Sequence, residues 1–329
     1  MSRHDRRKSA ATMKAYKRAE RKHAAQTVEQ YPVDLGSDRL AASVARIAAK
    51  LRADGETLNV FYPAAAELVI AECMRIAPSS PTTDDFFDRP KPGAPVNWQY
   101  ISRVLAVADT LYALKDSAGF DVFCKRLRCQ PVRASFFEAF AARMFTDLGY
   151  AITIRPETGV KGQDFDFIAS KDDTRINCEV TTLTGAEHSA ITVGNALEQK
   201  RKQLPTDAPA VIFVVTPERW FVGRNDEVVQ LLRDDALQAY NRSQRINSII
   251  FLNEQHTDFG LPDRGNLGFV FDASLNLAAR HQVTDLAAFI DGTLHRADVF
   301  PDEQRLAALE HVHQDSPFFN WASQFWTRQ

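Results

Sequence analysis

The sequence lacks the features that mark membrane, secreted and nucleotide-binding proteins. Its longest apolar run, AVIFVV at residues 210–215, has the length of a strand and falls far short of the ~20 residues that cross a membrane. The first residues contain no apolar segment like that of a secretory signal. No GxSxG, GxGxxG or Walker-type loop is present, which argues against a serine hydrolase, a Rossmann enzyme and a P-loop NTPase.

Cysteine is scarce and is not spaced to bind a metal. The four cysteines, Cys73, Cys124, Cys129 and Cys178, form no CxxC pair and no zinc-finger pattern. We therefore expect reduced thiols in a cytoplasmic protein. The eight histidines are scattered, and the HVH sequence at residues 311–313 does not have zinc-protease spacing.

The charge is unevenly distributed along a chain of otherwise ordinary composition. Hydrophobic residues make up 45% and charged residues 25%, enough for a sizeable core in one large domain or two. The net charge is −2, yet residues 1–30 contain nine Lys and Arg against three acids, and so carry about +6. This opening segment has few apolar residues. It is either a solvated, partly helical tail or an arm that binds phosphate.

The spacing of apolar residues predicts a helical first part. Helices are expected at residues 37–54, from Pro63 to about 76, and near 97–116, with a proline-rich loop at 77–96. The C-terminal segment SPFFNWASQFW is expected to dock over the core. The predicted regions are a basic tail at 1–35, a helical N-terminal domain at 36–129, an α/β core at 130–260 and a C-terminal extension packing on that core at 261–329.

The predicted core has the order helix, three strands, helix, strand, helix, strand. Two of its strands, DFDFIAS and TRINCEVTT, are joined by the polar turn KDD at residues 171–173. A helix then leads to the wholly apolar strand at 210–215, which has the character of a buried parallel strand. This crossover predicts an α/β sandwich with a mixed sheet.

Acidic residues occur in predicted strands where apolar residues are expected. Asp164 and Asp166 alternate with phenylalanines in QDFDF, and Glu179 lies between Cys178 and Val180. Because side chains alternate along a strand, the two aspartates share a face and can converge with Glu179 in an antiparallel pair. Close carboxylates repel unless a proton or cation lies between them, and such oxygen-rich sites suit Mg²⁺ or Mn²⁺. The alternative is that these acids face solvent in a half-exposed sheet.

This arrangement resembles the PD-(D/E)xK nuclease superfamily, whose restriction-endonuclease-like fold has an α-β-β-β-α-β core with a mixed sheet. The resemblance covers about residues 130–216. It implies that Asp164, or as second choice Asp166, binds Mg²⁺ or Mn²⁺ together with Glu179. It also implies that Glu138 on the preceding helix assists. The implied activity is phosphodiester hydrolysis in nucleic acid, with DNA as the substrate and bacterial restriction or defence as the setting.

One position departs from the family motif. The lysine of E-x-K is replaced by Thr181, and a neutral side chain cannot offset charge that develops on a phosphate. In the helix at 192–204, Lys200 falls within the apolar stripe that faces the sheet, whereas Lys202 lies on the solvent side. Lys200 is therefore the candidate for the displaced lysine, unless its ammonium extends past the helix edge into solvent. Gln203, near the same face, can hold a phosphate or a water.

The sequence therefore predicts a Mg²⁺- or Mn²⁺-dependent endonuclease. The alternative is a nuclease-like fold that has lost catalysis and acts as a nucleic-acid-binding or protein-interaction module, which the missing lysine favours. Nothing points to a membrane partner, and a homodimer remains open. The candidate catalytic residues are Glu138, Asp164, Glu179 and Lys200, the metal ligands Asp164, Asp166 and Glu179, and the substrate-positioning residues Thr181 and Gln203.

Overall fold

The structure is a computed structural model that describes residues 33–75, 86–87, 98–160, 162–261, 264–289 and 316–328. The basic tail up to residue 32, most of the proline-rich segment at 77–96 and the HVH sequence lie outside these residues. In the part of the chain that is described, no helix is long and apolar enough to cross a membrane. All four cysteines are free, as the sequence predicts.

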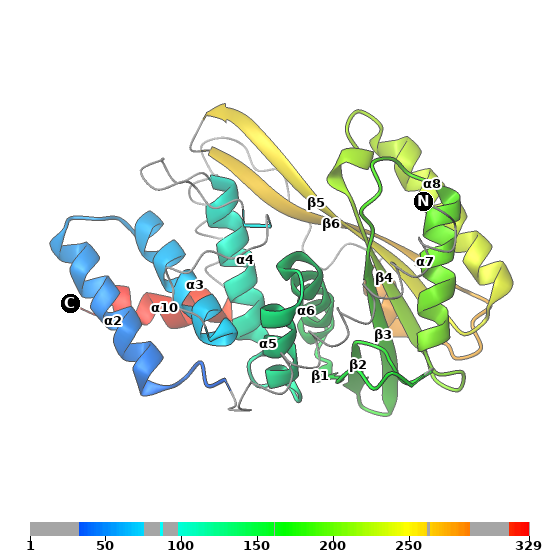
Figure 1. The fold of residues 1–329 in the computed structure, drawn as a ribbon, viewed down its shortest axis with the longest axis horizontal. Helices are drawn as coiled ribbons and strands as arrows, with labels where there is room; N and C mark the ends of the chain where they lie inside the picture. Colours follow the sequence, from blue (N-terminus) through cyan, green and yellow to red (C-terminus); the bar gives the residue numbers. More distant parts are fainter. Residues whose placement is uncertain are drawn as a thin grey trace, which may run out of the picture.

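Helices form the first part of the described chain (Figure 1). The first begins after Ser37, whose side chain caps the helix by accepting a hydrogen bond from the Leu40 N–H. The second begins earlier than predicted, at Leu58, and contains Pro63. The residues just before this proline, Phe61 and Tyr62, are buried in the core and extend the apolar face of the helix towards its N-terminus. The four helices are α2 (Asp38–Ala53), α3 (Leu58–Met74), α4 (Trp98–Leu114) and α5 (Phe120–Cys129).

Helix α5 was not predicted, and a glycine explains where it begins. Gly119 has φ 79, a left-handed conformation that glycine adopts without strain. A Cβ at this position would lie 2.4 Å from the carbonyl oxygen of Ile154, so only glycine permits this close approach. The neighbouring Ala118 forms an isolated bridge with Thr153. Helix α5 is thereby fixed beside the first strand of the sheet.

The sheet is mixed and has six strands in sequential order. Strand one pairs antiparallel with strand two, and strand two with strand three. Strands three, four and five run parallel, and strands five and six form an antiparallel pair. The α/β class with a mixed sheet is therefore confirmed. The strands are β1 (Ala151–Ile154), β2 (Phe167–Lys171), β3 (Thr174–Thr182), β4 (Ala210–Thr216), β5 (Ser248–Leu261) and β6 (Arg264–Leu275).

Helices cover both faces of this sheet (Figure 1). Helix α6 (Val132–Asp147) packs on one face, where Phe145 contacts Phe167 of β2 and Phe213 of β4. Helices α7 (Ala190–Gln203) and α8 (Asn225–Arg242) pack on the other face in a second apolar cluster. Since α6 and α7 flank the same strands from opposite sides, residues from both helices can meet at an edge of the sheet.

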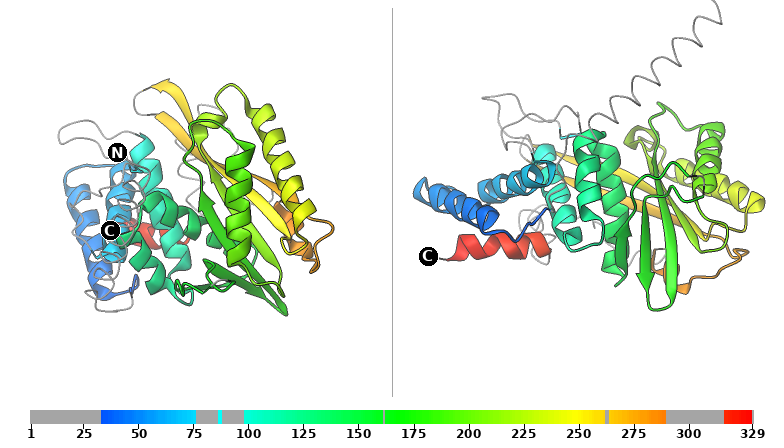
Figure 2. Two further views of the ribbon diagram at one scale, coloured as in Figure 1. Left: turned by 45° about the vertical axis from the view of Figure 1, so that its right-hand side comes forward. Right: turned by 60° about the horizontal axis from the view of Figure 1, so that its bottom comes forward.

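The C-terminal helix α10 (Pro317–Thr327) returns to the N-terminal helices, as Figure 2 shows. Phe319 stacks on Tyr62 with ring centroids 4.0 Å apart, and Trp326 lies 5.0 Å from Phe61. The extension predicted from residue 261 is thus divided: β6 completes the sheet, while α10 packs on α2, α3 and α4. Helices α2 to α6 and α10 share a single continuous core with one face of the sheet.

Candidate active site

Asp166 lies where the chain enters β2, and it is fixed to the neighbouring strand β3. Its backbone N–H donates to the carbonyl oxygen of Cys178 at 3.1 Å. Its carboxylate Oδ2 accepts a hydrogen bond from the Val180 N–H at 2.7 Å. These two bonds hold the carboxylate over β3 next to Glu179.

Asp164 lies outside this arrangement, which corrects the order of preference from the sequence. Strand β2 begins at Phe167, three residues later than predicted, because its partner β1 ends at Ile154. Asp164 is therefore in the preceding loop, where its Oδ1 accepts a hydrogen bond from the Thr158 N–H at 2.7 Å. In the described part of the chain, Asp164 forms no hydrogen bond or ion pair with the acid on β3. Asp166, the second choice, takes the place expected of Asp164.

Glu179 is buried in β3, with only 1% of its surface exposed, and it pairs with a lysine. The ammonium Nζ of Lys200 on α7 contacts its Oε1. The other oxygen, Oε2, is buried and has no hydrogen-bond partner among the described residues. The side chain of Lys202 is 52% exposed and pairs with Glu198 at 3.2 Å. The predicted orientations of both lysines are confirmed.

Glu138 of α6 reaches the same cluster through an arginine. Arg126 of α5 places Nη1 3.0 Å from Glu138 Oε2 and 3.7 Å from Asp166 Oδ1. Its Nη2 donates to the carbonyl oxygen of Arg155. Arg126 was missed in the sequence. The available signal was its position three residues after Phe123, on the buried face of an amphipathic helix.

The acids of the cluster share a low-dielectric environment, and their proton affinities respond to it. Burial, with a contribution from Asp166, raises the pKa of Glu138 to about 8. Burial and the charge of Asp166 also raise the pKa of Glu179 well above its usual value. Burial alone would lower the pKa of Lys200, but Glu179 and Asp166 outweigh it and raise that pKa. The lysine therefore stays charged at neutral pH, while the acids would be stabilised by additional positive charge.

The donor set of the cluster suits a hard divalent cation. No group of three His, Cys, Asp or Glu side chains in the described ranges is already arranged as a metal site. The free Oε2 of Glu179 is nevertheless a buried carboxylate oxygen without a partner, next to the carboxylate of Asp166. Carboxylate oxygens are the ligands that Mg²⁺ and Mn²⁺ prefer. Asp166 and Glu179 thus fit one divalent ion, with Glu138 close by.

The two predicted substrate-positioning residues lie close to the cluster in sequence and fold. Thr181 follows Glu179 by two residues on β3, so both side chains face the same side of the sheet. Gln203 lies one turn after Lys200 on α7, and its buried Oε1 has no hydrogen-bond partner within the described chain. An amide with an unused oxygen can bind a water or a substrate group. Both roles stay predictions.

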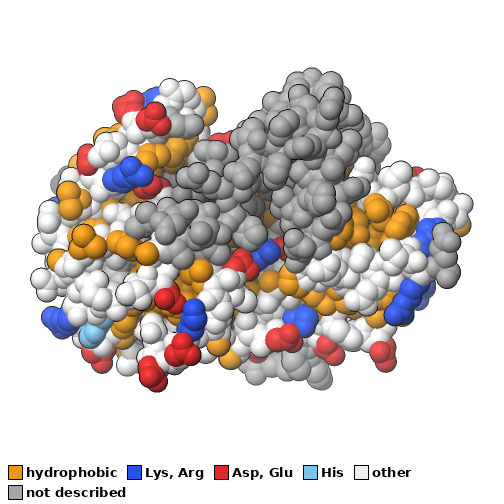
Figure 3. Space-filling model, turned by 180° about the vertical axis from the view of Figure 1, so that it is seen from behind, with side chains coloured by type: hydrophobic (Ala, Val, Ile, Leu, Met, Phe, Trp, Pro, Cys, Tyr) orange, Lys and Arg blue, Asp and Glu red, His pale blue; other side chains and the backbone are white. Residues whose placement is uncertain are grey.

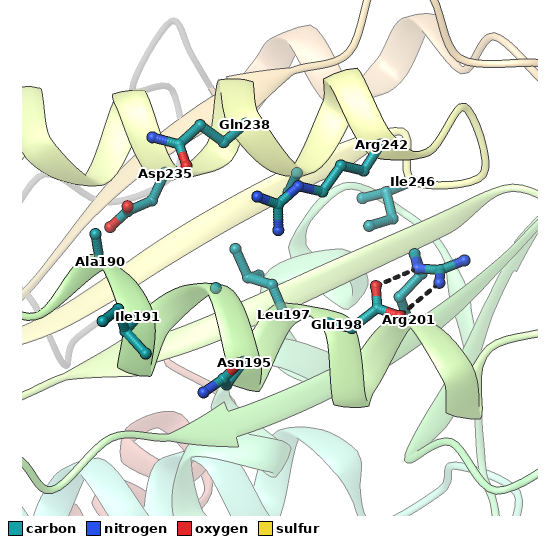
Figure 4. A pocket seen from close by; sticks show the side chains of 12 residues that line it. Ala190, Ile191, Asn195, Leu197, Glu198, Arg201, Asp235, Gln238, Arg242 and Ile246 are labelled. Carbon is teal, nitrogen blue, oxygen red and sulfur yellow. Dashed lines mark hydrogen bonds and ion pairs between the residues drawn. The ribbon is translucent and has the colours of Figure 1, made fainter.

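A groove of about 270 Å³ lies on the outer side of α7, between this helix and α8. Figure 4 shows Leu197 at its floor, Gln238 and Arg242 reaching over it from α8, and Arg201 paired with Glu198. Neither Lys200 nor its carboxylate partner lines this groove. The acid cluster is therefore a separate feature from the groove.

The surface seen from behind does not gather charge of one sign. In the described part of that face, Lys and Arg side chains are interspersed with Asp and Glu and with small apolar patches (Figure 3). No family model, curated protein or solved structure matches this sequence.

Proposed function

We propose that the protein is a metal-dependent nuclease that hydrolyses phosphodiester bonds, with DNA as the substrate. One observation carries the proposal: Lys200 of α7 contacts Glu179 of β3, next to Asp166. An acid on one strand, a second acid where the chain enters the neighbouring strand and a lysine that pairs with the first acid are the groups that the resemblance to PD-(D/E)xK nucleases calls for. Here the lysine comes from the helix instead of from position 181.

The order of the elements supports the same proposal. Helix α6 is followed by the antiparallel strands β1, β2 and β3, then by α7 and by β4, which is parallel to β3. This is the α-β-β-β-α-β order expected of a restriction-endonuclease-like core. Setting, partner and any role in bacterial restriction or defence rest on that resemblance alone.

The roles of the side chains follow from their charges. Asp166 and Glu179 would hold the divalent ion, which when bound would supply positive charge to offset the charge that develops on a phosphate. Lys200 stays protonated, so it acts as a hydrogen-bond donor that orients a water or a phosphate oxygen, and not as a base. Glu138, with a pKa of about 8, is able to take up or release a proton near neutral pH.

A second function is favoured by a specific observation. The cluster already contains two internal cations, Arg126 and Lys200, and the lysine of the E-x-K motif is replaced by Thr181. An acid cluster whose charge is balanced by Arg126 and Lys200 is stable without a metal ion, and it can therefore persist in a protein that no longer cleaves nucleic acid. The second candidate is therefore a nuclease-like module that binds nucleic acid or protein without hydrolysis.

Cleavage of supercoiled plasmid by the full chain in Mg²⁺ or Mn²⁺ tests the proposal. Asp166→Asn should lower the rate by about 100-fold or more, because it removes a charge from the site. The matched variant Asp164→Asn, two residues away in the same motif, should stay within about threefold of the unmodified protein, because Asp164 only caps a loop. An equal loss of cleavage rate in the two variants would contradict the assignment of Asp166 to the active site. An unmodified protein that binds DNA without cleaving it would support the second candidate.

A further inference from the structure

Arg126 occupies a position that the proposed chemistry does not require. Its side chain is buried, it comes from α5 outside the predicted motif, and it lies between the carboxylates of Glu138 and Asp166. A buried arginine needs anionic or carbonyl partners, and this one has three: Glu138, Asp166 and the carbonyl oxygen of Arg155. The side chain therefore neutralises part of the acid cluster from within.

The three contacts of Arg126 are not equivalent. The 3.0 Å contact to Glu138 Oε2 is a charge-assisted hydrogen bond. The 3.7 Å separation from Asp166 Oδ1 is too long for a hydrogen bond, so it is a purely electrostatic contact. If the guanidinium moves away from Asp166, it loses no hydrogen bond and keeps its anchors on Glu138 and on the Arg155 carbonyl.

The oxygen that faces Arg126 is the one that a metal ion would use. Asp166 Oδ2 accepts the Val180 N–H at 2.7 Å, which leaves Oδ1 as the oxygen directed at Arg126. On Glu179, Lys200 contacts Oε1, which leaves Oε2 without a partner. A divalent ion held by Asp166 and Glu179 would therefore share Asp166 with the guanidinium of Arg126, while Lys200 stays paired with Glu179.

We propose that Arg126 is an internal counterion that competes with the divalent cation for Asp166. In the metal-free protein the guanidinium keeps the acids together, and it must withdraw towards Glu138 before the cation binds. Removing its charge should therefore tighten metal binding, whereas a side chain that positions the acids for the metal would weaken binding when removed. The inference rests on the proposed metal site at Asp166 and Glu179.

Isothermal titration of the full chain with MnCl₂ tests this competition directly, without any cleavage assay. Arg126→Gln should bind Mn²⁺ about tenfold more tightly than the unmodified protein. Arg126→Lys keeps the charge but loses the fork that bridges three partners, so binding should tighten by a smaller factor, about threefold. Lys202→Gln, which removes a charge from the exposed side of α7, should leave the Mn²⁺ affinity unchanged.

The outcomes separate this inference from the proposed function. Mn²⁺ affinity that is equal or weaker in Arg126→Gln overturns the competition; if that variant fails to fold, the same result in Arg126→Lys does so. A loss of binding in Asp166→Asn, with no tightening in either Arg126 variant, overturns the competition but leaves the metal site in place. Mn²⁺ binding by Asp166→Asn at the unmodified affinity, or no binding by any variant, overturns both.

Discussion

Two glutamates of one sheet are equally buried but differ in how they are paired. Glu254 on β5 and Glu179 on β3 are each 1% exposed. Glu254 Oε1 accepts from Arg103 Nε at 2.8 Å and Oε2 from Arg133 Nη1 at 2.6 Å. Among the described residues, Glu179 has one such partner, Lys200, and its other oxygen has none. Burial therefore does not distinguish a structural acid from a candidate site; the number of satisfied oxygens does.

The charged neighbours of Glu254 and Glu179 also differ. The arginines that bind Glu254 come from α4 and α6, and both guanidinium groups lie over the ring of Phe86, so this ion cluster joins the sheet to the helical layer. Around Glu179, two further carboxylates, Glu138 and Asp166, share two cations. The first cluster is closed, because both oxygens of Glu254 are paired. In the second, Glu179 Oε2 has no hydrogen-bond partner among the described residues, so this cluster can accept a cation.

The largest expected effect follows from breaking the closed cluster. Glu254→Ala leaves Arg103 and Arg133 without their shared carboxylate, and we expect the free energy of unfolding to fall by about 3–5 kcal/mol. Urea denaturation followed by circular dichroism measures this loss. Arg233→Ala, which breaks the more exposed pair with Asp272, is the control and should cost below about 1 kcal/mol. A similar loss of unfolding free energy in the two variants would mean that Glu254 does not hold the sheet and the helices together.

The acid-rich cluster should make stability fall as the pH rises. Glu138 has a pKa of about 8 in the folded protein against a reference value of 4.5, so between these values the folded state binds more protons than the unfolded state. The free energy of unfolding should then decrease with pH, by at most about 1.4 kcal/mol per pH unit for this one group. Asp166 and Glu179, whose pKa values are also raised by burial, act in the same direction.

Glu138→Gln should flatten this slope, because the variant has no proton to release. Urea denaturation of both proteins between about pH 5 and about pH 8 provides the comparison. A slope that is unchanged in the variant would show that other groups govern the pH dependence.

Neutralising Glu179 should have a much smaller effect on stability than removing Glu254. Because burial disfavours its charged form, Glu179→Gln should leave the free energy of unfolding within about 1 kcal/mol of the unmodified value, or raise it. Plasmid cleavage in Mg²⁺ should be lost in the same variant. If Glu179→Gln unfolds readily but cleaves plasmid at the normal rate, Glu179 has a structural role and is not part of the active site.

The smallest effect on stability and cleavage is expected at Lys202, two residues after Lys200. Lys202→Ala breaks an exposed pair with Glu198 and should change the free energy of unfolding by under about 0.5 kcal/mol, with cleavage within about twofold. Lys200→Ala, its neighbour on the buried side, should lower cleavage by about 100-fold while leaving DNA binding in place. Equal rates in the two variants would remove Lys200 from the mechanism.

Local periodicity was enough to predict much of the fold and one part of the candidate site. The order of helices and strands from residue 130 to the fifth strand follows from apolar spacing. The inward direction of Lys200 follows from its place between Leu197 and Leu204, since a helix returns to the same face every three or four residues. These features depend on residues that are neighbours in the sequence.

The choice between Asp164 and Asp166, the presence of Arg126 and the closed pairing of Glu254 were decided only by the tertiary structure. Where β2 begins depends on where its partner β1 ends, and this places one aspartate in a loop and the other against β3. Arg126 and Glu254 find their partners on other elements, the latter at positions 151 and 121 residues away. Such contacts form only after α4, α5 and α6 have packed on the sheet. The sequence cannot reveal them, because the pattern of a buried acid is the same whether its oxygens are satisfied or free.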